Sequence, residues 1–457
     1  MTTYSISTPP GGLRYQAKQE LNGGALFVKN SSIAYRLTSS GFTQITDVDY
    51  PKSTVWGVVY LDGYMFVQES SSGRIYNSDS LDSTSWGALN YIVPEKEPSL
   101  AVAIAKSLNY LVAFKSWDTE FYYDAGNAAP GSPLSTVDSS YLKLGCASAD
   151  SIIEFDGGIV FMSKRDNNQR SREIHVLNGL TPKKISTPEI ERLINGDDLS
   201  TLYALYLSTA GHQFYVLTLK TLGITIVYDF NNGEWYQWTM LTAATAQSVS
   251  ASNLTSSSGI ATCTITAHGF SDGDTVTVAG ANQSQYNGDQ VVTISDANTF
   301  TYPIDDTPVS PATGTITATG YTESYFAFVS YAQFANVDLV QHETNGIIYA
   351  LAPSLFKDDG TPIQFVLHTQ NWDNGNNYRK TVNSVRLVGD KVTGTGYIRY
   401  SDDDSLTNSS YRPIDLSVQS AAMWRMGQTR RRNYDVKYID DTAVRFEAIE
   451  QFFTQDQ

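Results

Sequence analysis

The sequence is poor in cysteine and in basic residues. Its 457 residues include only two cysteines, Cys146 and Cys263, and no CxxC pair, so neither a zinc cage nor a disulfide framework is indicated. Lysine and arginine together number 31 against 47 aspartates and glutamates, which gives a formal net charge of −16. A protein that binds nucleic acid has to neutralise phosphates, so this balance argues against ordinary DNA or RNA binding.

Motifs for catalysis, metal binding and targeting are also missing. The five histidines form neither HxH nor HExxH, and the sequence has no GxxxxGK[ST] loop and no GxSxG elbow. The apolar stretch at 100–105 is much too short to span a membrane. Residues 1–10 have no basic start and no apolar run, which predicts that there is no signal peptide. We therefore expect no catalytic residues, no metal, no cofactor and no membrane insertion.

Tyrosine and glycine are abundant, at 29 and 33 residues, and Ser, Thr, Asn and Asp fill the gaps between apolar runs. Aromatic and β-branched residues favour half-buried pleated surfaces, whereas Gly, Asn and Asp make tight turns. The composition therefore predicts an all-β protein with many short strands. Only residues 187–195 look helical, with Thr187 as the cap and Pro188 in the first turn.

One hairpin motif recurs along the chain. A turn of the Asn-Gly or Asp-Gly type precedes a short apolar strand, a second turn and another strand, and such a dipeptide is the strongest short-range hairpin signal because both turn residues need a positive φ. Five clear copies and a weaker sixth have their first turns at 22–24, 62–63, 108–109, 156–158, 210–211 and 334–336. Units of three or four strands at this spacing are typical of propeller blades. We predict a β-propeller of about six blades, with a two-sheet sandwich as the alternative.

The repeat is interrupted and later stops. Residues 248–319 are rich in Thr, Ala, Ser and Gly and read as a small β-barrel or sandwich inserted into a blade loop. After residue 358 longer strands predict a C-terminal β-sandwich. We expect an N-terminal arm at 1–20, the first part of the propeller at 21–247, the inserted module at 248–319, the closing part of the propeller at 320–357 and the sandwich at 358–457.

Several segments, taken in order, are similar to those of a known family. They are Thr-Glu-Phe-Tyr-Tyr-Asp-Ala-Gly-Asn at 119–127, Gly-Ser-Pro-Leu at 131–134, Gly-Cys-Ala at 145–147, and the stretches at 156–163, 185–191, 211–217, 424–427 and 430–432. In these segments the chain resembles the packaged-DNA stabilisation, or tail-hub, proteins of short-tailed bacteriophages. Residues 248–319 depart from the common core of that family and add an exposed surface.

The resemblance implies a non-enzymatic structural protein of the virion tail, assembled in the host cytoplasm. Such proteins form a ring, usually a homohexamer, below the portal and its adaptor ring. They extend the DNA channel, retain the packaged genome until ejection, and hold tail spikes or fibres and the tail needle. The acidic composition is compatible with a channel that DNA passes without sequence-specific binding.

The candidate interface residues lie near the C-terminus. Trp424 and Arg425 precede the basic run Arg430, Arg431 and Arg432, and Trp and Arg favour interface hot spots. Three adjacent arginines on a strand would point to both faces. The alternative is that these arginines are solvated or paired with neighbouring acids.

Two other functions stay open. Residues 401–408 partly resemble the Asp-box turn Ser-x-Asp-x-Gly-x-Thr-Trp of sialidases, with Ser405 in place of Gly and Asn408 in place of Trp. This leaves a glycan-binding or glycan-hydrolysing propeller as an alternative, although such a box is a hairpin-folding device and hydrolysis needs two facing carboxylates. Asp402–Asp404 could also bind calcium, but no full ligand pattern is present. A third hypothesis is that the inserted module binds a host surface.

Overall fold

The computed structural model describes residues 16–20, 24–138, 140–165, 171–304, 308–352 and 354–455. Most of the predicted N-terminal arm and most of the turn at 22–24 lie outside these residues. The described chain contains 42 strands and one α-helix, which confirms the predicted all-β class. The chain divides into two compact units, which are Met1–Trp238 with Tyr325–Leu351 (unit 1) and Thr239–Ser324 with Ala352–Gln457 (unit 2). The finer five-part division remains a prediction.

Unit 1 contains six antiparallel sheets among its described residues. The first sheet contains β1 (Gln16–Gln19), β2 (Leu26–Lys29), β3 (Ala34–Thr38) and β4 (Gly41–Gln44). The second contains β5 (Val59–Leu61), β6 (Tyr64–Gln68), β7 (Ile75–Asp79) and β8 (Asp82–Ile92). The third contains β9 (Ala101–Ser107), β10 (Tyr110–Lys115), β11 (Thr119–Asp124) and β12 (Leu134–Thr136).

The later sheets of unit 1 vary this pattern. The fourth contains β13 (Gly145–Cys146), β14 (Ile153–Phe155), β15 (Gly158–Lys164), β16 (Arg172–Asn178) and β17 (Thr181–Lys184). The fifth contains β18 (Tyr203–Thr209), β19 (His212–Leu219), β20 (Ile224–Asp229) and β21 (Glu234–Ala243). The sixth has three strands, β30 (Phe328–Phe334), β31 (Val337–His342) and β32 (Ile348–Leu351).

Some turns of the repeat have the predicted backbone, whereas at 108–109 and 156–158 only Leu108 and Gly158 have a positive φ. Asp62 and Gly63 have φ values of 48° and 99°, and Ala210 and Gly211 have values of 51° and 82°. Two consecutive residues with positive φ match the right-handed twist of the flanking strands. The single helix α1 (Pro188–Gly196) begins as predicted, because the side chain of Thr187 accepts a hydrogen bond from Ile190 N.

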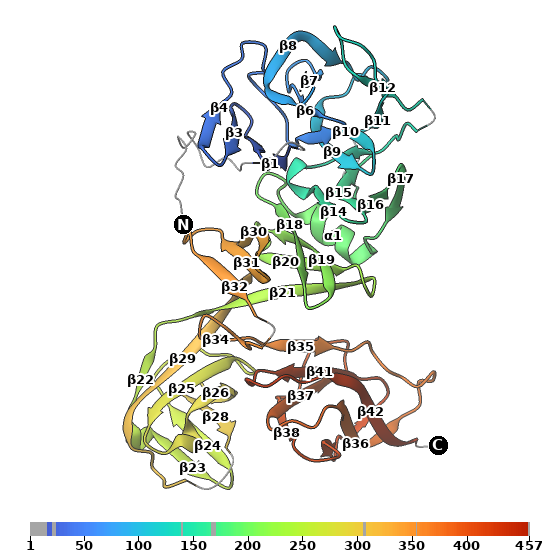
Figure 1. The fold of residues 1–457 in the computed structure, drawn as a ribbon. Helices are drawn as coiled ribbons and strands as arrows, with labels where there is room; N and C mark the ends of the chain where they lie inside the picture. Colours follow the sequence, from blue (N-terminus) through green and yellow to red (C-terminus); the bar gives the residue numbers. More distant parts are fainter. Residues whose placement is uncertain are drawn as a thin grey trace. The chain divides into compact units, whose positions relative to one another are not determined.

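Consecutive sheets of unit 1 share buried clusters. Four such clusters join the first sheet to the second, the second to the third, the third to the fourth and the fourth to the fifth. The ion pair between Lys18 on β1 and Glu154 on β14 joins the first sheet to the fourth. The orange β30, which follows the insertion in sequence, lies beside the green β18 of the fifth sheet (Figure 1). The chain thus returns to unit 1 after an interruption.

The inserted part of unit 2 consists of two sheets around one apolar core. One sheet contains β22 (Gln247–Val249), β25 (Thr275–Ala281), β26 (Gly288–Val291) and β29 (Gly314–Tyr325), and continues through β29 to β21. The other contains β23 (Leu254–Ser257), β24 (Ile260–Thr264), β27 (Thr293–Asp296) and β28 (Thr299–Pro303). Buried residues from both sheets, including Val276, Phe300 and Ile316, form the core.

The C-terminal part of unit 2 is also built from two main sheets. One sheet contains β35 (Phe365–His368), β37 (Thr395–Ser401), β38 (Arg412–Asp415) and β41 (Asn433–Tyr438). The other contains β36 (Lys380–Gly389), β39 (Ala422–Trp424), β40 (Gln428–Thr429) and β42 (Phe446–Gln455). A short pair, β33 (Lys357–Asp358) and β34 (Thr361–Pro362), precedes them. Val385 from one sheet and Ile398 and Val436 from the other share a buried core, as in a β-sandwich.

Candidate assembly sites

The three arginines of the basic run have different environments. They lie in the connection between β40 and β41, not on a strand as the sequence suggested. Arg432 is only 1% exposed, donates to the two carboxylate oxygens of Asp402 at 2.6 and 2.8 Å, and lies 3.9 Å from the ring centre of Tyr400. Arg431 is half exposed and pairs with Asp404 at 2.7 Å. These two arginines therefore have the acidic partners that the alternative interpretation proposed.

The acidic partners lie in the Asp-box-like turn, which joins β37 to β38. Asp403 accepts hydrogen bonds from Ser401 Oγ and from both the backbone N and the hydroxyl of Thr407, and these bonds lower the pKa of its carboxyl group. Ser405 has a φ of 68°, the left-handed conformation that the glycine of an Asp box adopts readily. The turn thus folds the hairpin and presents Asp402 and Asp404 to the arginines.

The remaining candidate residues are exposed. Trp424, at the end of β39, is 64% exposed. Arg425 follows it with a φ of 61° and forms no ion pair with any described residue. Arg430 donates to the carbonyl of Asn377 at 2.8 Å, and its side chain is exposed. Of the five candidate interface residues, Trp424 and Arg425 are thus exposed, and Arg430 is exposed but bonded to Asn377. Arg431 and Arg432 pair with Asp404 and Asp402.

A buried charge cluster in unit 1 was missed by the sequence reasoning. Lys115, at the end of β10, pairs with Asp118 at 3.0 Å and with Glu120 at 2.8 Å, and each of the three residues is at most 2% exposed. Glu120 also accepts a hydrogen bond from Tyr122 Oη at 2.7 Å, and Ser99 donates to Asp118. Burial raises the pKa of Asp118 and of Tyr122. The signal that could have revealed this cluster is the acidic Glu120 directly before the aromatic run 121–123.

A second buried lysine joins the two parts of unit 2. Lys437 on β41 donates to the carbonyl of Gly273 in the inserted part at 2.8 Å, and it forms no ion pair with a described carboxylate. Burial lowers the pKa of its ammonium group to about 8. Beside it, Val291 of the insertion packs with Tyr397, Tyr411 and Ile439 of the C-terminal part. The two parts of unit 2 therefore share an apolar contact with a buried polar bond at its side.

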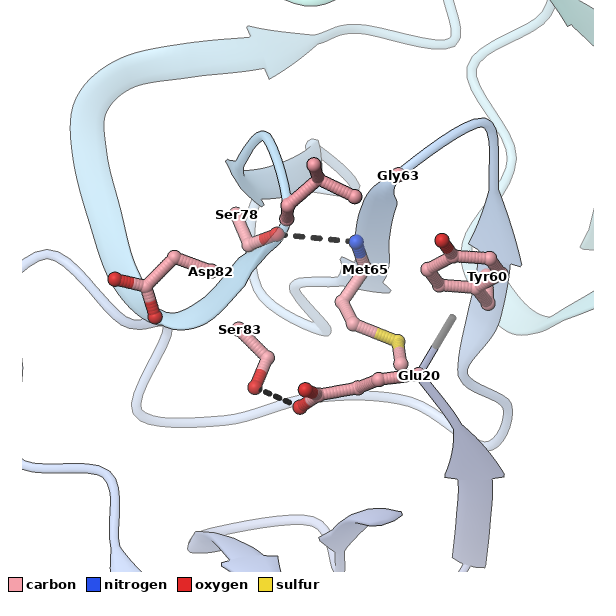
Figure 2. Close-up of a pocket in the computed structure, with 8 residues that line it drawn as sticks. Glu20, Tyr60, Gly63, Met65, Ser78, Asp82 and Ser83 are labelled. Atoms are coloured by element: carbon pink, nitrogen blue, oxygen red, sulfur yellow. Dashed lines mark hydrogen bonds between the residues drawn. The ribbon is translucent and has the colours of Figure 1, made fainter. Parts of the chain in front are cut away.

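Figure 2 shows a pocket in unit 1 that two carboxylates line, Glu20 and Asp82. Glu20 accepts hydrogen bonds from Arg36 and from the hydroxyl of Ser83, and Asp82 accepts two from Thr84. These bonds from Thr84 lower the pKa of Asp82. The pocket has room for about one water molecule, so it does not accommodate a sugar.

Within the described residues, no three His, Cys, Asp or Glu side chains are grouped so that they could hold a metal ion. The described part of the chain also has no helix that is long and apolar enough to cross a membrane.

Repeated four-stranded antiparallel sheets that share their apolar faces define a protein of the β-propeller class. The family model described as bacteriophage P22 Gp10, β-propeller, matches residues 3–267, which is more than half of the chain. The chain belongs to this family of phage structural proteins that stabilise packaged DNA. The predicted family and the predicted propeller are thereby confirmed. The number of blades remains a prediction.

Solved structures give only distant likenesses. The extracellular domain of a one component system from B. thetaiotaomicron is 12% identical, with a TM-score of 0.33, over 90% of this chain and 46% of that one. The chain thus spans about half the length of that structure. BamB from Moraxella catarrhalis is 11% identical, with a TM-score of 0.30, over 73% of this chain and 92% of that one. No curated protein matches the chain.

Proposed function

We propose that the chain is the subunit of a tail-hub, or nozzle, ring in a phage virion. Six copies form a ring below the portal and its adaptor, extend the DNA channel, retain the packaged genome until ejection and anchor the tail spikes or fibres and the tail needle. The subunit is made in the host cytoplasm and joins the tail there. The family match over residues 3–267 carries this proposal.

The charge and the side-chain bonding support the proposal. A formal charge of −16 repels DNA, so a ring of such subunits lets DNA move through the channel without binding a particular sequence. The carboxylates of the pocket in unit 1 and of the Asp-box-like turn are held by structural hydrogen bonds. No observation on the described residues favours the glycan alternative over a structural role.

The proposed ring can be tested by imaging. Purified protein is examined by negative-stain microscopy alone and with the adaptor ring of its own phage. We expect sixfold rings that stack coaxially on the adaptor. A stable complex with the adaptor that lacks rotational symmetry would overturn the proposal. So would a protein that neither forms rings nor binds the adaptor.

A further inference from the structure

Two edge strands of the chain combine exposed apolar side chains with an absence of Asp, Glu, Lys and Arg. The one titratable residue on them is His368 of β35, whose Nδ1 contacts the carboxylate of Asp435. β35 lies at the end of its sheet and pairs on one side only, with β41, and all four of its residues are exposed. β32 lies at the end of the three-stranded sheet and pairs only with β31; Ile348 within it is 63% exposed. Such edges present unpaired backbone N–H and C=O groups to any strand that approaches.

Other edges of the same molecule are protected. β38, at the opposite end of the β35 sheet, carries Arg412, Pro413 and Asp415, and β17 has the sequence Thr-Pro-Lys-Lys. Charged residues and proline on an edge strand hinder the addition of a further strand. In contrast, the segments 345–356 and 361–372, which contain β32 and β35, have no Asp, Glu, Lys or Arg. The sheet that contains both β35 and β38 is thus protected at one edge and open at the other.

The open edges are suited to contacts between copies of this chain. Two copies with a charge of −16 each repel one another at long range, and a contact surface without charged side chains adds no local repulsion to this. β32 and β35 are each four residues long and have exposed apolar side chains, among them Ile348 on β32, and Phe365 and Val366 on β35. When strands pair, main-chain hydrogen bonds provide affinity and alternate side chains provide specificity.

We propose that the open edge of β35 in one copy pairs with the open edge of β32 in the next copy. A contact between two different edges is head-to-tail and closes into a ring when the rotation between copies permits it, whereas pairing of β35 with β35 would end in a twofold dimer. The contact completes the three-stranded sheet of one copy with a fourth strand from its neighbour. It rests on the proposed ring and names the surfaces that build it.

The first test uses cysteine cross-linking between separately purified proteins. The Ile348→Cys protein and the Val366→Cys protein are mixed under mild oxidation; the native Cys146 and Cys263 are both buried and give little background. We expect a disulfide-linked dimer in the mixture and little in either protein alone. The Leu89→Cys protein, altered at an exposed residue of β8, is the matched control and is expected not to link to Val366→Cys.

The outcomes separate this contact from the ring itself. Rings on the micrographs together with no dimer in the mixture would overturn the contact and leave the ring standing. A dimer in the mixture without rings would support the contact and overturn the ring. The contact would also be overturned if the Val366→Cys protein linked to itself. It would likewise be overturned if a protein carrying both Ile348→Cys and Val366→Cys formed the disulfide only within one chain.

The second test uses charge. Val366→Lys or Ile348→Asp alone is expected to lower the assembled fraction by roughly tenfold or more, because each places a charge on an uncharged contact. The doubly substituted protein, with opposite charges on the two edges, is expected to recover part of the assembly. Leu406→Lys, at a residue that is 85% exposed in the turn after β37, is the control and should assemble normally. Unchanged melting temperatures of the subunits verify folding, and normal assembly of both single variants would overturn the proposal.

Discussion

Two buried lysines of the chain, Lys115 and Lys437, have opposite environments. Lys29 of unit 1 is of the same kind as Lys437, because it donates to Thr54 and to the carbonyl of Val55 and burial lowers its pKa to about 7. In unit 1, Lys115 lies between two carboxylates, those of Asp118 and Glu120, so its charge is matched where water is absent. In unit 2, Lys437 is also buried, but its ammonium group meets the carbonyl of Gly273 and no described carboxylate within ion-pair distance. The carboxylate partners of Lys115 therefore stabilise its charged form, whereas the surroundings of Lys437 disfavour its charged form.

The difference follows from where each lysine lies. Lys115 is part of a single hairpin, and residues 118–120 of the same hairpin supply its acidic partners. Lys437 lies where the inserted and C-terminal parts of unit 2 meet, so its partner comes from a distant part of the chain. A cluster within one hairpin strengthens that hairpin, whereas a bond across a junction sets how firmly two parts are held together.

Lys115→Met is expected to have the largest effect. The substitution removes one charge and leaves two carboxylates buried against each other, which typically costs about 3–5 kcal/mol of stability. The free energy of unfolding, measured with urea, should fall by that amount, whereas Lys52→Met, at an exposed lysine, should leave it nearly unchanged. A loss below about 1 kcal/mol would show that the two carboxylates are accommodated without the lysine.

Lys437→Met is expected to act in the opposite direction. The folded state has a pKa of about 8 at this lysine, below the ordinary value of 10.5, so the unfolded chain binds the proton more tightly. The parent protein is therefore penalised below pH 8 and gains stability as the pH rises from about 8 to 10.5. Methionine fills similar space without charge, so it should raise stability near pH 7 by up to about 3 kcal/mol and abolish that rise with pH.

The free energy of unfolding of variant and parent is measured with urea across the pH range, and the difference between the two is compared. Taking the difference removes the contribution of other groups, which titrate in both proteins. Lys391→Met, at an exposed lysine, is the control and should give a flat difference. A destabilised Lys437→Met protein at neutral pH would mean that the bond to Gly273 outweighs the cost of burying the charge.

Gly273→Ala examines the other side of the same junction. Gly273 has a φ of 86°, and a Cβ there would lie 2.8 Å from the ring of Tyr411. Gly269 has a similar φ of 75° with nothing within 4 Å, so Gly269→Ala reports the backbone strain alone. We expect Gly269→Ala to cost about 1 kcal/mol and Gly273→Ala about 1 kcal/mol more. Thermal melting measures both, and equal losses would show that the ring of Tyr411 moves aside freely.

The sequence predicted local structure well because the signals are local. The Asp62–Gly63 turn and the cap at Thr187 depend on residues close together in the chain, and the structure has both. The bond from Lys437 to Gly273 could not be predicted, because it depends on how two parts pack 164 residues apart. The pairing of Arg432 with Asp402 could not be predicted for the same reason. The sequence contains several acidic residues nearby, but it does not indicate which of them contacts Arg432.

Arg431→Ala is expected to have the smallest effect and extends the comparison to the surface. Arg431 and Asp404 form a pair of a cation with a carboxylate, as Lys115 does with its partners, and the two charged groups are 2.7 Å apart. Unlike the pairs of Lys115, both side chains are about half exposed. Water screens such a pair, so its loss should cost at most about 0.5 kcal/mol. Urea unfolding at low and high salt measures this cost, with Arg432→Ala as the reference, since Arg432 is buried while its partner Asp402 is partly exposed. If the cost of Arg431→Ala approached that of Arg432→Ala, burial would not be what distinguishes the strong charge pairs of this protein from the weak ones.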